Sequence, residues 1–121
     1  MKANELMTGD WVINSETNEY CMVVKLEYDD GWSFVTVISN NNRDTISAKP
    51  IPITPEILEK NRFTKHVYGF SFQYLKLQGN LRNDDTVYFT ITISGKDITI
   101  DYVHQLQHAL RLCGIEKTIE L

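Results

Sequence analysis

The chain has 121 residues and a net charge of −4, and 42% of its residues are hydrophobic. These values are typical of a globular protein that folds as one domain or as two small packed units. Residues 1–53 hold four Lys or Arg and eight Asp or Glu, whereas residues 54–121 hold eight of each kind. Neither part has the basic stripe that binding to a phosphate backbone requires, which counts against a general DNA- or RNA-binding protein.

No apolar run has the features of a signal peptide or the length of a membrane-spanning helix. We therefore expect a cytoplasmic protein that makes no membrane contact. Cys21 and Cys113 lie far apart in apolar patterns and have no neighbouring cysteine. They are expected to be buried as small hydrophobic side chains, and the sequence does not say whether they meet.

The first part of the chain predicts short strands at residues 11–13, 20–28, 32–38 and 43–48. The second of these alternates with a period of two, and the Asp-Gly pair that follows it predicts a tight hairpin. The third is rich in β-branched and aromatic residues. This order, opened by Gly9 and Asp10, resembles the start of SH3-like barrels. Residues 1–48 are therefore predicted to form a small SH3-like β-barrel or meander.

Residues 49–53 are predicted to be a stiff connector, because each of its two prolines fixes φ and disfavours a helix before it. Thr54 is a suitable N-cap and Pro55 a suitable first helical residue. A short helix is therefore predicted over residues 55–61.

The remaining chain, residues 54–121, is predicted to be an α+β subdomain with an antiparallel sheet and two helices. Strands are expected at residues 68–74, 87–93, 98–100 and 115–121, with a polar loop at residues 78–85. Asp101 is placed to cap a second helix over residues 102–113, which Gly114 would end. One arc of this helix is apolar, and the opposite side holds His104, Gln105, His108, Arg111 and Leu112.

The second helix carries the strongest pattern for a metal site. His104 and His108 are one helical turn apart, which suits two zinc ligands, and Asp101 lies a turn earlier as a candidate third ligand. Zinc proteases need a Glu after the first His, and Gln105 at that position takes no proton. A polar helix face that holds two histidines is the simpler interpretation, and we expect no cofactor.

Four aromatic residues recur at every second position and would share one face of a strand. They are Tyr68, Phe70, Phe72 and Tyr74. Such a row would suit the stacking of nucleic-acid bases, but Lys65 and Lys76 alone flank it, so packing in the core is the preferred interpretation. Trp11 and Trp32 are candidates for a groove or for the core of the first unit.

Three segments carry a resemblance to a known family: LMTGDWV at residues 6–12, IPITPEILEKN at 51–61 and YVHQLQ at 102–107. In this order they resemble a family of short uncharacterised proteins of phages, prophages and mobile elements of intestinal anaerobic bacteria. Family members often have Gly after the Asn that ends the first helix. Arg62 stands there in this chain, which weakens the expected left-handed cap, although Asn61 itself can adopt that conformation. The resemblance implies a setting and no activity.

No nucleophile with its base, no phosphate-binding glycine loop and no complete metal ligand set is recognisable in the sequence. We therefore predict a non-catalytic protein-binding or adaptor module. Its partner would be a protein of phage or host origin, or a second copy of the chain. Leu112, an apolar residue on the polar side of the second helix, is a candidate contact. The alternatives are a nucleic-acid-associated protein and a metal-dependent hydrolase.

Overall fold

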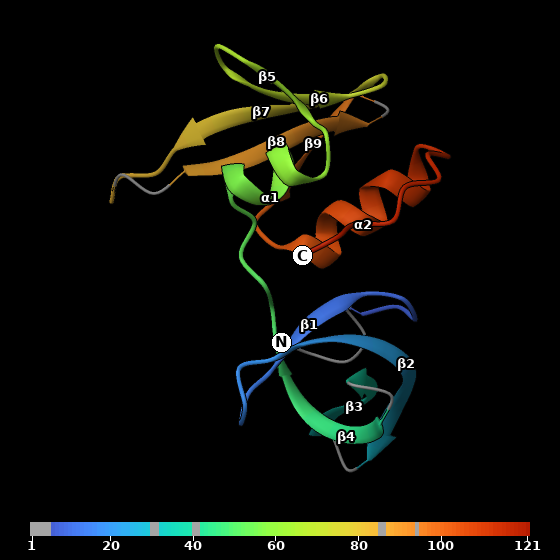
Figure 1. Cartoon of the computed structure of the whole chain (residues 1–121). Coiled ribbons are helices and arrows are strands. Elements are labelled where there is room, and N and C mark those ends of the chain that lie inside the picture. The colour runs from blue at the N-terminus through green and yellow to red at the C-terminus, as the bar shows by residue number, and fades with distance from the viewer. Residues whose placement is uncertain (1–5, 30–31, 40–41, 85–86, 94) are drawn as a thin grey trace. The chain divides into compact units, whose positions relative to one another are not determined.

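The computed structural model describes residues 6–29, 32–39, 42–84, 87–93 and 95–121, with the backbone alone for the described residues within 25–47 (Figure 1). The fold is mixed α+β, with two antiparallel sheets and two helices. The chain divides into two compact units, Met1–Ile51 and Pro52–Leu121. Among the described residues, no helix is long and apolar enough to cross a membrane.

The N-terminal unit consists of four antiparallel strands: β1 (Trp11–Asn14), β2 (Tyr20–Asp29), β3 (Trp32–Ser39) and β4 (Asn42–Lys49). All four predicted strands are confirmed, and β1 pairs with both β2 and β4. The turn residues 30 and 31 lie outside the described residues, but Asp29 pairs with Trp32 as the predicted hairpin requires. Among the side chains that the structure describes in this unit, four buried ones form a core cluster: Leu6, Val12, Cys21 and Val23.

The C-terminal unit contains a five-stranded antiparallel sheet in the order β5-β6-β7-β8-β9, and Figure 1 shows both helices on one side of it. Its elements are α1 (Pro55–Lys60), β5 (Thr64–His66), β6 (Gly69–Phe72), β7 (Leu75–Leu81), β8 (Val87–Ile93), β9 (Lys96–Ile100) and α2 (Val103–Leu112). Alternate strand residues face the helices and are buried, among them Leu77, Phe89 and Ile91.

Helix α1 begins as the sequence predicts and ends differently. The Thr54 hydroxyl accepts a hydrogen bond from the Ile57 backbone N–H at 3.2 Å, as an N-cap does. At the other end Asn61 has φ −92°, and the exposed Arg62 adopts the left-handed conformation with φ 66°. The left-handed residue is thus Arg62 and not Asn61, whose side chain binds the backbone carbonyls of Ile57 and Glu120. The Phe63 N–H donates to the Leu58 carbonyl at 3.0 Å and completes the C-terminal cap.

Arg62→Gly is therefore expected to stabilise the C-terminal unit by roughly 0.5–1 kcal/mol, because a left-handed residue with a Cβ is strained and glycine is not. The gain would appear as a higher urea midpoint with an unchanged slope. Arg62→Ala keeps the Cβ and is the matched control, for which no gain is expected. Equal midpoints for the two variants would contradict this account.

The N-terminus of helix α2 is capped by a different residue from the one that the sequence predicts. Its N-cap is Tyr102, so the prediction of Asp101 as the cap was wrong. The Gln105 side-chain oxygen accepts hydrogen bonds from the backbone N–H groups of Asp101 and Tyr102 at 2.7 and 3.0 Å. Gln105, which stands where a zinc protease would have its Glu, is thus a capping residue of α2. The predicted end is confirmed, since Gly114 has φ 69°.

Three strand predictions were wrong in this unit. β7 continues through residues 78–81, which were predicted to be loop, because its polar Gln78 and Asn80 alternate with core-facing positions. Residues 68–74 are not one strand, because Gln73 has φ 53° and the chain turns there. Residues 115–121 form no strand, and the side chain of Asn61 binds the backbone of Glu120 in place of a strand partner.

Candidate binding surface

The β5–β6 hairpin ends in a loop of two exposed apolar residues. Val67 and Tyr68 lie between the paired residues His66 and Gly69, and their side chains are 89% and 81% exposed. Two-residue hairpin loops prefer Gly, Asn or Asp, because their favoured conformations need positive φ angles. Val67 and Tyr68 have no positive φ. The two side chains therefore contribute nothing to the core, and they stand where two-residue hairpin loops usually have other residues.

The paired ends of β7 and β8 add two further exposed apolar residues. Leu81 pairs with Val87, and their side chains are 70% and 53% exposed. By the alternation of their strands, both lie on the face that buries Leu77 and Phe89. The apolar face of the sheet thus continues beyond the part that the helices cover. We call Val67, Tyr68, Leu81 and Val87 the hairpin patch.

An open groove of about 410 Å³ joins these residues. The whole hairpin patch lines it, together with Pro55 at the start of α1. A second open hollow of about 700 Å³ shares Val67 and Tyr68 and is also lined by Lys76 and Gln78 of β7. The hairpin tip is therefore a ridge that contributes to two hollows, and each has room for a side chain of a partner.

The charges around the hairpin tip have one sign. Lys65 and His66 line the groove, and His66 and Lys76 line the second hollow, whereas no Asp or Glu among the described residues lines either of them. The His66 Nε2 lies 2.6 Å from the Ser71 hydroxyl, which orients the imidazole. The surface thus combines an apolar centre with cationic groups at its rim, an arrangement that favours an anionic partner.

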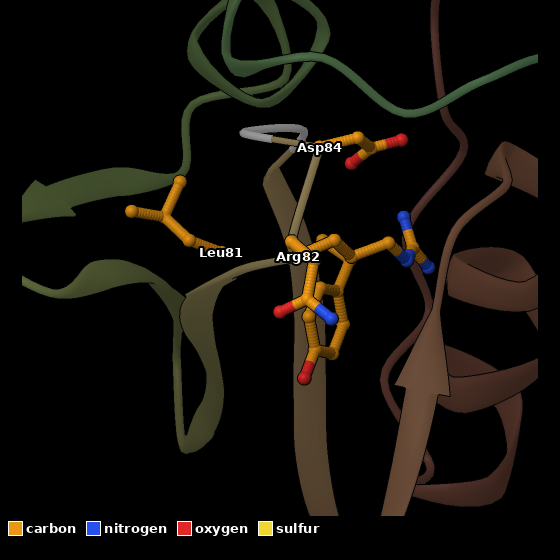
Figure 2. Close-up of a pocket in the computed structure, with 5 residues that line it drawn as sticks. Leu81, Arg82 and Asp84 are labelled. Carbon is orange, nitrogen blue, oxygen red and sulfur yellow. The ribbon is translucent and has the colours of Figure 1, made fainter.

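A third depression, of about 590 Å³, lies next to Leu81 but differs in charge. Figure 2 shows the Leu81 and Arg82 side chains pointing away from each other, as consecutive strand residues do. Arg82 forms an ion pair with Asp101, and its guanidinium lies 4.5 Å from the centre of the Tyr88 ring. The hydrogen bond to Asp101 raises the pKa of Arg82. Because Arg82 is already paired, it adds little to the cationic rim.

The structure separates the aromatic row that the sequence suggested. Phe70 is 6% exposed and packs against Phe89, and Phe72 is half-buried against Phe63. The expectation of core packing therefore suits these two members of the row. Tyr68 and Tyr74 lie in the two turns that flank β6 and are exposed. No continuous row of four rings is left for stacking with bases.

The structure does not bring the candidate metal ligands together as a set. Among the residues that it describes, no three His, Cys, Asp or Glu side chains form a group suited to a metal ion. The Asp101 carboxylate binds Arg82. His104 was predicted on the polar side of α2 and is buried instead, with its ring stacked on Tyr102 at 5.8 Å. The His108 ring lies edge-on to that of His104, also at 5.8 Å.

The remaining candidates are spread over both units. Trp11 is half-buried in β1, while the side chain of Trp32 lies outside the described residues. Leu112 is exposed on α2, as its position on the polar face predicts. Cys21 is buried, Cys113 is half-buried, and both are thiols.

Sequence reasoning missed three of the four residues of the hairpin patch: Val67, Leu81 and Val87. Val67 stands between a lysine-histidine pair and a glycine, where the sequence carries no strand or turn signal of its own. The available signal was the absence of Gly, Asn and Asp from the Val67-Tyr68 pair just before Gly69, but this signal requires the hairpin register to be known. Leu81 and Val87 were assigned to a loop and a strand that were not known to be partners.

No family model matches the chain, and neither a curated protein nor a solved structure matches it. The geometry and chemistry of the hairpin patch are therefore the basis of the functional proposal.

Proposed function

We propose that the chain is a non-catalytic protein-binding or adaptor module that binds its partner through the hairpin patch. The single observation that carries this proposal is the pair of nearly fully exposed apolar side chains, Val67 and Tyr68, in a loop where turn chemistry favours other residues. Exposed apolar side chains that gather beside a groove are typical of interaction sites, whereas scattered ones are not. Leu81 and Val87 line the same groove as Val67 and Tyr68, so the four side chains form such a group.

Two expectations from the sequence belong to the same proposal. The first is that the N-terminal unit is an SH3-like barrel, which the pairing of β1 with both β2 and β4 supports. The second is the setting, the bacterial cytoplasm during expression of a phage, prophage or mobile element, with a phage or host protein as the partner. The sequence resemblance supports this setting.

Site-directed photocrosslinking in the full chain tests the proposal. A photoreactive amino acid is introduced at Tyr68, at Leu112 or, as the control, at Tyr74 in the next turn of the same sheet, where the side chain is 65% exposed. We expect a discrete protein adduct from position 68 that is absent from position 74 and is lost when Leu81→Ser is added. Adducts from position 112 alone would place the interface on α2 and not on the hairpin patch. Identical patterns at all three positions would contradict the proposal.

A further inference from the structure

We propose that the groove beside the hairpin patch binds a short acidic peptide segment that inserts one bulky apolar side chain. This inference rests on the proposed function and names the chemical class of its partner. The apolar side chain would lie among Tyr68, Leu81 and Val87. The carboxylates of the segment would face Lys65 in the groove and Lys76 in the second hollow, which shares the hairpin tip.

The size of the surface favours a short segment over a second copy of the chain. A standard protein interface buries roughly 800 Å² on each partner and 20–30 residues a side. The hairpin patch has four apolar residues, and the groove of about 410 Å³ is of the size that holds one or two side chains. A short segment needs little more than an anchor in a pocket, because a few residues carry most of the binding energy of an interface.

The charges favour an acidic peptide over a nucleic acid. Nucleic-acid binding draws on many phosphate contacts, and a protein with 6–10 of them loses about 10³–10⁵ in affinity between low and moderate salt. Here Lys65, His66 and Lys76 are the basic residues that line the two hollows, and the C-terminal unit has as many acidic as basic residues. Lys65 in the groove and Lys76 in the adjoining hollow suit a few carboxylates next to an apolar anchor.

Selection from a phage-displayed library of random peptides on the immobilised full chain tests the inference. We expect the enriched peptides to combine Asp or Glu with one Leu, Phe or Trp. For a labelled peptide from this selection, Val67→Ser with Tyr68→Ser is expected to weaken binding at least about tenfold, as the loss of a hot spot does. Lys65→Glu with Lys76→Glu is expected to weaken it about tenfold at low salt and less at high salt.

The controls separate this inference from the proposed function. Tyr74→Ser removes an exposed aromatic side chain from the same sheet and is expected to leave the affinity within about twofold. Leu81→Ser repeats the test on a different strand, and far-UV circular dichroism verifies that each variant is folded. Enriched peptides that lack acidic residues but are weakened by Val67→Ser with Tyr68→Ser, or no enrichment at all, overturn the inference and leave the proposed function standing. Peptides that bind all variants equally, or binding of oligothymidylate in place of peptide, overturn both.

Discussion

Gly69→Ala is expected to destabilise the C-terminal unit by about 3 kcal/mol, because a side chain does not fit where β6 meets β7. A Cβ atom on Gly69 would lie 1.9 Å from the backbone carbonyl oxygen of Leu77 and 3.2 Å from the Cα of Gln78. Gly69 pairs with Gln78, so the clash falls on the hydrogen-bonded ladder itself. Backbone atoms of a central strand do not move aside as a flexible side chain does, and the hairpin would have to separate from β7.

Gly79→Ala is the matched control on the neighbouring strand. Its Cβ would meet the Tyr68 carbonyl oxygen at 3.3 Å and the Phe89 ring at 3.8 Å, contacts that a small shift relieves. We expect its effect to stay within about 1 kcal/mol, since the tight contact is offset by the reduced entropy of the unfolded chain. Similar losses for the two alanine variants would show that close strand approach at Gly69 is not the cause.

The measurement must report on the C-terminal unit. Both tryptophans, Trp11 and Trp32, belong to the N-terminal unit, so tryptophan fluorescence is not a direct probe of the sheet that contains Gly69. Hydrogen exchange followed by mass spectrometry at increasing urea concentration resolves peptides of residues 52–121 from the rest of the chain. For Gly69→Ala, protection of β6 and β7 is expected to be lost at lower urea.

The same substitution links stability to the proposed binding surface. Gly69 follows directly on Val67 and Tyr68, and the Gly79 N–H donates to the Tyr68 carbonyl at 2.7 Å. The close approach of β6 to β7 therefore fixes the hairpin tip beside Leu81. Gly69→Ala is expected to impair peptide binding even where enough folded protein remains.

The sequence was informative wherever a local pattern alone determines an element. The alternation in residues 20–28 and 87–93 predicted β2 and β8, and Gly114 marked the end of α2. In each case the period of the side chains or the φ requirement of a glycine is a property of the segment itself. The four strands of the N-terminal unit were predictable for the same reason.

The sequence failed where a pairing partner lies far along the chain. The Tyr68–Tyr74 row has the period of a strand, but the turn at Gln73 divides it. Leu81 became part of the candidate site because it pairs with Val87 and lies beside a hairpin tip, and none of these relations is local. The site was therefore found from register and burial, with no catalytic or metal-binding motif to indicate it.

The C-terminal segment gives the clearest example of a missing partner. Ile119 and Leu121 alternate with Thr118 and Glu120, and this alternation predicted a strand at residues 115–121. In the structure the side-chain amide of Asn61 takes the place of a neighbouring strand. Its oxygen accepts from the Glu120 N–H at 2.7 Å, and its nitrogen donates to the Glu120 carbonyl at 2.8 Å. One buried amide thus provides the backbone hydrogen bonds of a single residue, as a β-ladder does for several residues.

Asn61→Ala is therefore expected to destabilise the C-terminal unit by roughly 2–4 kcal/mol, because a buried amide with three hydrogen bonds is lost and the Glu120 backbone loses both of its bonds to that amide. Besides the two bonds to Glu120, the Asn61 nitrogen donates to the Ile57 carbonyl at 2.8 Å. Asn61 is 2% exposed, so water does not replace these contacts without local opening. The loss would appear as a lower urea midpoint in hydrogen exchange of residues 52–121.

The Asn61→Asp variant distinguishes the stability that the hydrogen bonds contribute from the stability that side-chain packing contributes. Aspartate has nearly the same shape and keeps an acceptor for the Glu120 N–H, but it loses both donors and brings a carboxylate against two carbonyl oxygens. We expect it to be at least as destabilising as alanine at neutral pH, while the Glu120 amide remains better protected than in Asn61→Ala. Asn83→Ala, an exposed asparagine in the β7–β8 connection, is the control and should change stability by less than about 0.5 kcal/mol. If Asn61→Asp matched the wild type, shape alone would hold the C-terminal segment against α1, and the amide pairing would contribute nothing.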